Sequence, residues 1–213
     1  MKFDRICFDF DSTLSRLEGI DELAVRAGCG DAIAQLTEAA MNGEVPLEEV
    51  YGKRLELIRP DRSAIEWLAE RYRNEIVDGV DALFARLHAE ARQVYIVSGG
   101  IRQSILPMAS YLRVPEEHVH AVDVYFDDDG SYLDFDRGSA LARAGGKAEI
   151  CRQLKGDGLT LAMVGDGSTD LEAKQAGACF IGFGGVVDRP KVREGADHYV
   201  GDRSLLAVLQ YLN

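Results

Sequence analysis

The chain shows two kinds of hydrophobic pattern. After Asp78-Gly79, short apolar runs alternate with amphipathic stretches whose apolar positions recur every three or four residues. Runs of the first kind predict buried strands, and stretches of the second kind predict helices packed on one face. An apolar opening segment around Ile6 and Phe8 adds a first strand. The sequence therefore predicts an α/β fold with a doubly wound, mostly parallel sheet.

The expected elements follow one another in alternation, with one exception. We expect strands over 94–97, 159–164 and 179–181, and helices over 80–90, 103–112, 147–154, 169–176 and 205–212. The exception is a pair of strand-like runs, 122–126 and 131–135, separated by Asp127-Asp128-Asp129-Gly130. These acids resemble the start of a calcium loop, but the bidentate Glu that such a loop needs is missing. A hairpin turn is the better interpretation.

The segment from about Leu17 to Ile76 differs from the rest, because it shows helical periodicity throughout and no convincing strand. It separates the first strand from the remainder of the sheet. We interpret it as a helical cap inserted after the first strand and able to close over the ligand crevice. The predicted division is a catalytic core of residues 1–15 and 77–213 and a cap domain of residues 16–76.

Composition and charge limit the classes of binding partner that we expect. The net charge is −12, and no Lys/Arg-rich run or basic stripe is present, so nucleic acid and anionic membrane are not expected as partners. The N-terminal residues mix acid and base, and no apolar run approaches transmembrane length, which predicts a cytoplasmic protein. The four cysteines lack C-x-x-C spacing, and the four histidines form no recognisable ligand set, although His118 and His120 could share a strand face. We expect reduced, packed thiols and structural imidazoles.

Two carboxylates follow the first strand. Asp9 and Asp11 in Phe8-Asp9-Phe10-Asp11-Ser12-Thr13 leave the sheet where an open α/β fold places its ligand crevice. Acids this close repel each other and are costly to bury unless a divalent cation or a shared proton compensates them. The alternative is an ordinary polar turn, since Asp and Ser are common turn residues.

Further polar clusters follow other strands in the same way. Ser98-Gly99-Gly100 ends an apolar run and opens a helix, so a hydroxyl and backbone amides can face an anion; a simple tight turn is the alternative. Gly165-Asp166-Gly167-Ser168-Thr169-Asp170 adds two carboxylates at the same edge of the sheet. Four acids at one edge indicate a site for magnesium, which prefers hard oxygen ligands.

Two cations occupy unusual positions. Lys147 follows Gly145-Gly146 at the start of a helix, where its charge opposes the helix dipole unless an anion is bound nearby. Arg54 interrupts the apolar face of the helix expected around 47–58, so its guanidinium needs a carboxylate or phosphate partner. An exposed lysine and a structural acid partner for Arg54 are the plainer alternatives. Glu18, where the cap begins, is an acid of the kind that is usually solvated.

Taken in order, these motifs resemble the haloacid dehalogenase superfamily of phosphatases. The four motifs are DFDST at 9–13, SGG at 98–100, GGK at 145–147 and GDGSTD at 165–170. The cap text EGIDELA at 18–24, AMNGEVP at 40–46 and RLELIRP at 54–60, with FIGFGG at 180–185, is similar to the phosphoserine phosphatase family within it. Asn42 stands where members of that family commonly have Gly, Leu47 where an aromatic is common, and Ser168 is at a variable position.

The resemblance implies a magnesium-dependent enzyme of serine biosynthesis that hydrolyses O-phospho-L-serine through an aspartyl-phosphate. Asp9 would be the nucleophile, Asp11 the general acid and then base, and Ser98, Lys147 and the Gly99 and Gly100 amides would neutralise the phosphoryl group. The ion would be held by Asp9, the Asp11 main-chain carbonyl and Asp166, with Asp170 supporting it. The substrate's amino-acid end would meet the cap and loop residues Glu18, Met41, Asn42, Arg54 and Thr169.

Two alternatives to this function stay open at this point. A phosphotransferase, or a phosphatase for another small phosphomonoester, could use the same intermediate, for example by passing phosphate to homoserine. A signalling receiver domain also combines clustered acids, a lysine and an acceptor aspartate, although it needs neither the second acid of DFDST nor a cap. The sequence leaves a monomer or a homodimer open.

Overall fold

A computed structural model of the chain describes residues 2–41 and 47–212, with the side chains of 37–41, 47 and 48 left aside. Its centre is a parallel sheet of six strands in the order β3-β2-β1-β6-β7-β8. The strands are β1 (Arg5–Phe8), β2 (Gln93–Ile101), β3 (Val119–Val122), β6 (Leu161–Gly165), β7 (Cys179–Phe183) and β8 (His198–Val200). The predicted doubly wound, mostly parallel α/β sheet is confirmed.

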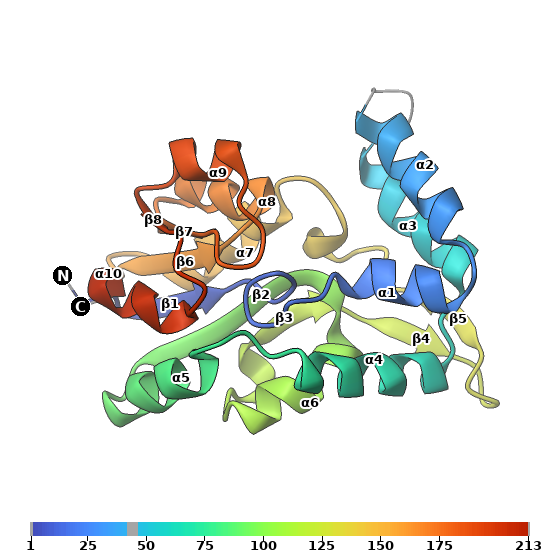
Figure 1. Ribbon diagram of the computed structural model, residues 1–213, viewed down its shortest axis with the longest axis horizontal. Helices are drawn as coiled ribbons and strands as arrows, with labels where there is room; N and C mark the ends of the chain where they lie inside the picture. The colour runs from blue at the N-terminus through green and yellow to red at the C-terminus, as the bar shows by residue number, and fades with distance from the viewer. Residues whose placement is uncertain (1, 42–46, 213) are drawn as a thin grey trace.

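Helices cover both faces of this sheet (Figure 1), with α5 and α6 on one face and α7, α8 and α9 on the other. The α-helices are α1 (Gly19–Arg26), α2 (Gly30–Met41), α3 (Leu47–Ile58), α4 (Arg62–Asn74), α5 (Val80–Ala89), α6 (Arg102–Tyr111), α7 (Gly146–Lys155), α8 (Ser168–Leu171), α9 (Pro190–Gly195) and α10 (Leu209–Leu212). Short 3₁₀ turns are η1 (Glu116–His118), η2 (Ala140–Ala142), η3 (Glu172–Ala176) and η4 (Leu205–Val208). None of the helices in the described ranges is long and apolar enough to cross a membrane.

β1 is the innermost strand, and its sequence explains why. It lies between β2 and β6, and its side chains Ile6, Cys7 and Phe8 are fully buried. A strand covered by helices on both faces reads as a continuous apolar run, as this one does. The order of strands reverses at β1, because the chain passes from β1 to β2 on one side and later reaches β6 on the other. The crevice beyond the carboxyl end of β1 is therefore the expected ligand site.

Four helices, α1 to α4, occupy the chain between β1 and α5, and no strand occurs in the described parts of that segment. The two ends of the segment lie side by side. Arg16 N donates to Glu75 O at 2.8 Å, and Val77 N donates to Leu14 O at 3.0 Å. α4 packs along α6 of the core, whereas α2 and α3 pack on each other and stand away from the sheet (Figure 1).

The hairpin prediction is confirmed, but one boundary is wrong. β4 (Val124–Phe126) and β5 (Tyr132–Phe135) pair antiparallel, and the turn closes with Gly130 N donating to Asp127 O at 2.9 Å. They form a sheet of their own, however, and Val122, expected in the hairpin, ends β3 of the main sheet. The boundary was wrong because β3 is a half-exposed edge strand. Burial does not alternate along it, since His120 and Ala121 are both partly exposed, so the sequence shows no strand pattern there.

Other differences concern the ends of the fold. The strand β8 and the helix α9 were not predicted, and the helices expected over 169–176 and 205–212 each combine an α-helical turn with a 3₁₀ turn. The cysteines have free thiols, as expected. His118 stacks on Tyr95 with ring centroids 4.1 Å apart, so its role here is in packing.

Candidate active site

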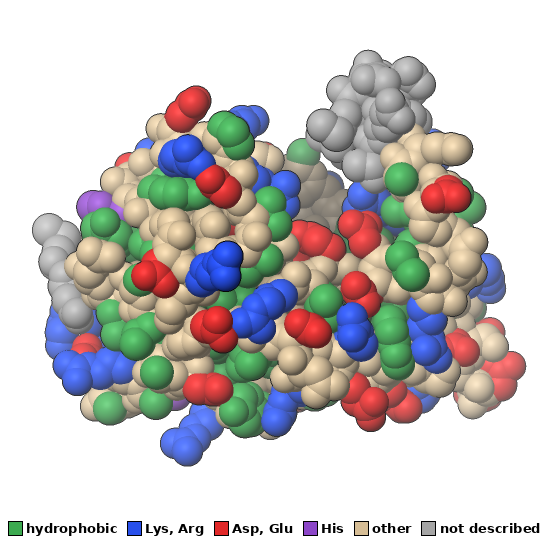
Figure 2. All heavy atoms as spheres, in the orientation of Figure 1, with side chains coloured by type: hydrophobic (Ala, Val, Ile, Leu, Met, Phe, Trp, Pro, Cys, Tyr) green, Lys and Arg blue, Asp and Glu red, His purple; other side chains and the backbone are tan. Residues whose placement is uncertain are grey.

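A cavity of about 690 Å³ opens at the carboxyl end of β1. Figure 2 shows the molecule hollowed between the lobe that carries α2 and α3 and the lobe that carries α8 and α9. Most of the site residues predicted from sequence line this cavity, namely Asp9, Asp11, Glu18, Arg54, Ser98, Gly99, Gly100, Lys147, Asp166 and Thr169. Asp170 is fully buried beneath it. Asn42 and the side chain of Met41 lie outside the described part of the structure.

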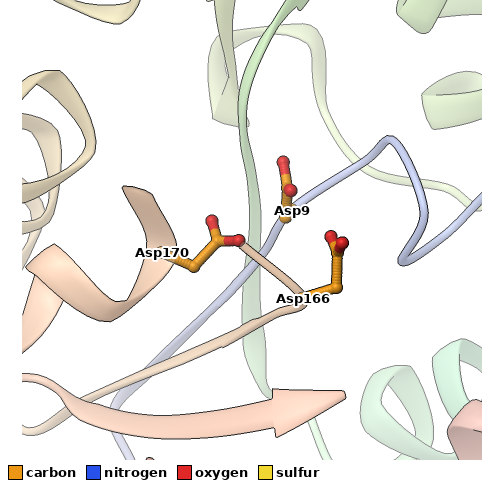
Figure 3. Close-up of side chains that lie close together, drawn as sticks. All are labelled: Asp9, Asp166 and Asp170. Atoms are coloured by element: carbon orange, nitrogen blue, oxygen red, sulfur yellow. The ribbon is translucent and has the colours of Figure 1, made fainter. Parts of the chain in front are cut away.

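Three carboxyl groups converge in this cavity from three segments (Figure 3). Asp9 follows β1, Asp166 follows β6, and Asp170 lies in α8, and one oxygen of each lies within 4.8 Å of the other two. The approach of Asp170 requires Gly165, since a Cβ there would lie 2.3 Å from Asp170 Cγ. Burial and the nearby Asp9 raise the pKa of Asp166, although Arg189 opposes this. Buried carboxyl groups that repel one another in this way fit a hard divalent cation, which binds their oxygens.

Lys147 compensates the negative charge of two of these groups. Its Nζ lies 2.7 Å from Asp9 Oδ1 and 2.6 Å from Asp170 Oδ1. Burial alone would lower the pKa of Lys147, but the two carboxylates outweigh it and raise the pKa, so the side chain stays an ammonium. Its partners in this structure are thus acids of the protein. The sequence had left a bound anion and an exposed lysine open, and the side chain is buried.

The two glycines before Lys147 shape the start of α7. Gly145 has φ of +77°, in the left-handed region, and a Cβ on Gly146 would lie 1.8 Å from Ala140 O. Any larger side chain at Gly146 would push the helix away from the η2 turn. The backbone therefore needs the two glycines of the GGK motif to bring Lys147 to the end of β1.

Asp11 has a different environment from Asp9. Its Oδ1 accepts hydrogen bonds from Tyr72 Oη at 2.7 Å and from Gly19 N at 3.0 Å. Burial, with Glu18 nearby, raises the pKa of Asp11 to about 8, although the two hydrogen bonds oppose the rise. Its side chain is not part of the three-carboxylate cluster. At neutral pH, Asp11 therefore holds a proton that it can donate.

Tyr72 was missed by the sequence reasoning. It is fully buried in α4, and its ring meets Phe10 edge to face with centroids 4.6 Å apart. A Cβ on Gly19 would lie 1.8 Å from Tyr72 Oη, so this glycine makes room for the hydroxyl. The only local signal was a tyrosine on the apolar face of a helix, which is more often plain packing.

Ser98 lies in the cavity wall, but its backbone differs from the prediction. β2 continues through Ile101, and α6 begins at Arg102, so Ser98-Gly99-Gly100 do not open the helix. Parallel pairing resumes where Ile101 meets Val122 after a register shift, which keeps these residues extended. Gly100 N donates to Ser98 Oγ at 2.9 Å. Because the oxygen accepts this bond, the Ser98 hydroxyl hydrogen can point at a ligand.

Arg189 is a second residue that the sequence did not reveal. Its Nε donates to Asp166 Oδ2 at 3.1 Å, and its Nη2 lies 3.7 Å from Glu18 Oε1. Glu18 also accepts a hydrogen bond from Ser12 Oγ at 2.7 Å. Arg189 thus links the start of the helical segment to the acid after β6. No local pattern singled it out, because it precedes the short helix α9, which was itself not predicted.

Arg54 and Tyr51 approach the cavity from α3. On the same helix Val50 and Ile58 are buried, as the periodicity predicted. Arg54 thus reaches the cavity from within an apolar helical face.

Comparisons with known proteins place this site in a family. A model of haloacid dehalogenase-like hydrolases matches residues 3–177. The chain belongs to the haloacid dehalogenase-like hydrolases. It is 41% identical to the chloroplastic phosphoserine phosphatase of Arabidopsis thaliana, across 91% of this chain and 67% of that protein. It is 39% identical to the phosphoserine phosphatase of Homo sapiens, across 93% of this chain and 89% of the human protein.

A solved structure of this family has the same fold. It is a phospho-aspartyl intermediate analogue of phosphoserine phosphatase, with a TM-score of 0.82, 27% sequence identity and full coverage of both chains. The resemblance stated from the motifs is confirmed, and this hydrolase is a phosphatase. The match to a hydrolase family over most of the chain removes the receiver-domain alternative.

Asp11 provides a test of the site's electrostatics in metal-free protein. Its pKa is 3.8 in an unstructured chain and about 8 here, so between these values the folded protein holds a proton that the unfolded chain has released. The free energy of unfolding should therefore fall as pH rises through this window. In Asp11→Asn the side chain has the same shape but cannot ionise. In chelator at pH 8 this variant should be more stable than the parent by on the order of 1–4 kcal/mol.

Urea unfolding of both proteins at pH 5 and pH 8 measures this difference. The difference between the two proteins should be smaller at pH 5 than at pH 8, because less of the window between the two pKa values lies below pH 5. An equal pH dependence in the two proteins would show that Asp11 is ionised throughout.

Proposed function

We propose that the protein hydrolyses O-phospho-L-serine to L-serine and phosphate through an aspartyl-phosphate. The observation that carries the proposal is the contrast between two neighbouring carboxyl groups at one cavity. Asp9 pairs with an ammonium, whereas Asp11 is held by a hydroxyl and an amide with a pKa of about 8. Acids and bases of an enzyme are assigned by such divergent environments. The names of the relatives support phosphoserine as the substrate.

The first step transfers the phosphoryl group to Asp9. A carboxylate oxygen of Asp9 forms a bond to phosphorus as the bond from phosphorus to the serine oxygen breaks. Asp11 gives its proton to that oxygen, so serine leaves as a neutral alcohol. In the second step Asp11, now ionised, takes a proton from water as the water oxygen attacks phosphorus, which releases phosphate and regenerates Asp9.

Donors around Asp9 would stabilise the transferring group. Lys147 Nζ lies 2.7 Å from the attacking carboxylate, so it can also reach a phosphoryl oxygen. The Ser98 hydroxyl and the amides of Gly99 and Gly100 line the same wall. Charge stabilisation of this kind supplies most of the catalysis of phosphoryl transfer.

We propose Mg²⁺ as the cation of the carboxylate cluster. Asp9 and Asp166, with the Asp11 main-chain carbonyl, would hold it, and Asp170 would support it from below. The hard oxygen donors and the raised pKa of Asp166 support this assignment. When bound, the ion supplies positive charge against the phosphoryl oxygens.

The amino-acid end of the substrate would meet the helical segment. Glu18 would bind the ammonium and Arg54 the carboxylate, with Met41, Asn42 and Thr169 beside them. Residues 16–76 would act as a cap over a core of 1–15 and 77–213, and the adjacent backbone bonds at Arg16 and Val77 support these boundaries. A cytoplasmic location and a monomeric or homodimeric state remain predictions.

A phosphotransferase with the same intermediate is the alternative, differing only in the acceptor of the phosphoryl group. Product analysis separates the two. The proposed enzyme releases one phosphate for each serine, and the transferase forms a new phosphomonoester when homoserine is added.

Asp9→Asn should abolish phosphate release from phosphoserine, because the amide is a poor nucleophile. The variant should still fold, and circular dichroism provides that control. Phosphate release is measured with freshly prepared protein that mass spectrometry shows to be free of deamidation. Substantial turnover in that preparation would rule out Asp9 as the nucleophile.

The carboxylate cluster predicts dependence on magnesium. Activity should be lost in excess chelator and restored by Mg²⁺. Ca²⁺ should inhibit, because its larger and looser coordination shell misplaces the nucleophile and the phosphate. Phosphate release in a metal titration measures both effects, and full activity in chelator would contradict the assignment.

Arg54→Ala tests the substrate's carboxylate contact. Loss of a hydrogen bond to a charged group should lower kcat/KM for phosphoserine by roughly 10- to 150-fold. p-Nitrophenyl phosphate lacks the carboxylate, so the same variant should lose much less on it. Equal losses on both substrates, in a variant whose circular dichroism is unchanged, would mean that Arg54 acts on the phosphate or on the fold.

A further inference from the structure

Tyr51 lies one helical turn before Arg54 on α3 and faces the same cavity. Its hydroxyl oxygen is buried and has no hydrogen-bond partner among the residues that the structure describes. The ring is fixed against Phe135, with centroids 5.3 Å apart. The hydroxyl is thus held in place by packing and not by a polar contact with a described residue.

A buried hydroxyl of this kind needs an explanation. Burying it costs the hydrogen bonds that it made to water, and phenylalanine would fill the same space without that cost. Tyr51 borders both the active-site cavity and a neighbouring cavity of about 650 Å³, which Arg54 and Thr169 also line. The side chain that carries the buried hydroxyl is therefore part of the wall of both cavities.

The surroundings identify the kind of ligand group. Burial, and then the nearby Asp11 carboxyl, raise the pKa of Tyr51, so its hydroxyl stays protonated and can donate. Residues three apart lie on the same side of a helix, so Tyr51 and Arg54 share one face of α3, and both line the same cavity. A cation and a neutral donor side by side suit a carboxylate, which has several lone pairs to share.

We infer that Tyr51 is a specificity-determining residue, and that its hydroxyl donates a hydrogen bond to the carboxylate at the amino-acid end of the substrate. This inference rests on the proposed function. It extends the carboxylate site from one residue to a pair on α3. It also assigns to Tyr51 a contact that is made equally in the bound substrate and in the transition state, because the carboxylate is remote from phosphorus.

Tyr132 offers a matched control. Its hydroxyl is also buried without a hydrogen-bond partner in the described ranges, but it lies on β5 and lines neither cavity. If unpartnered tyrosines were merely a feature of packing in this protein, Tyr51→Phe and Tyr132→Phe would behave alike.

The test compares kcat and KM of both variants and the parent on O-phosphoserine and on O-phosphoethanolamine, which differs from it by lacking the carboxylate. Tyr51→Phe should raise KM for phosphoserine about tenfold or more, leave kcat near the parent value, and leave kcat/KM for phosphoethanolamine unchanged. Tyr132→Phe should match the parent on both substrates.

Two outcomes would overturn the inference alone. In one, the parent is active on phosphoserine and Tyr51→Phe is indistinguishable from it, as expected if water is the partner of the hydroxyl. In the other, Tyr51→Phe lowers kcat/KM by the same factor on both substrates. A parent enzyme without activity on phosphoserine would instead overturn the proposed function, and the inference with it.

Discussion

The buried ammonium of Lys147 is the interaction on which the site depends. It joins Asp9 after β1 to Asp170 in α8, at 2.7 and 2.6 Å, from its own position at the start of α7. Removing the lysine would leave two buried acids without their counter-charge, which is strongly destabilising. Three segments distant in sequence are thereby held together at the carboxyl end of the central strand. This arrangement requires glycine at three positions. A side chain at 146 or 165 would clash, and Gly145 has a positive φ.

The helical segment completes the chemistry of the core and does more than cover it. Asp11 follows β1 on the core side, yet both of its hydrogen-bond donors, Tyr72 and the Gly19 amide, belong to the inserted helices. Neighbouring acids thus acquire different properties, because Asp9 faces an ammonium and Asp11 faces neutral donors in a desolvated position. α3 contributes Arg54 and Tyr51 to the same cavity, so the proposed contacts to the substrate's carboxylate also come from the inserted helices.

Features with a local cause could be predicted from the sequence. β1, the helices α5 to α7 and the placement of Asp9, Ser98 and Asp166 at one sheet edge follow from periodicity and from the geometry of parallel sheets. β3 and β8 could not be predicted, because short edge strands are half exposed and lack alternation. Tyr72 and Arg189 were missed because their partners are distant in sequence, and only tertiary packing brings them together.

The central claim is that Asp9 carries the phosphoryl group during turnover. The most direct measurement mixes the enzyme rapidly with phosphoserine, quenches it in acid and locates the modification by peptide mass spectrometry. The account predicts one phosphoryl group on the peptide that contains Asp9, lost on treatment with hydroxylamine and absent from Asp9→Asn. A phosphoryl group on another residue, or rapid turnover with no phosphorylated peptide at any quench time, would contradict it.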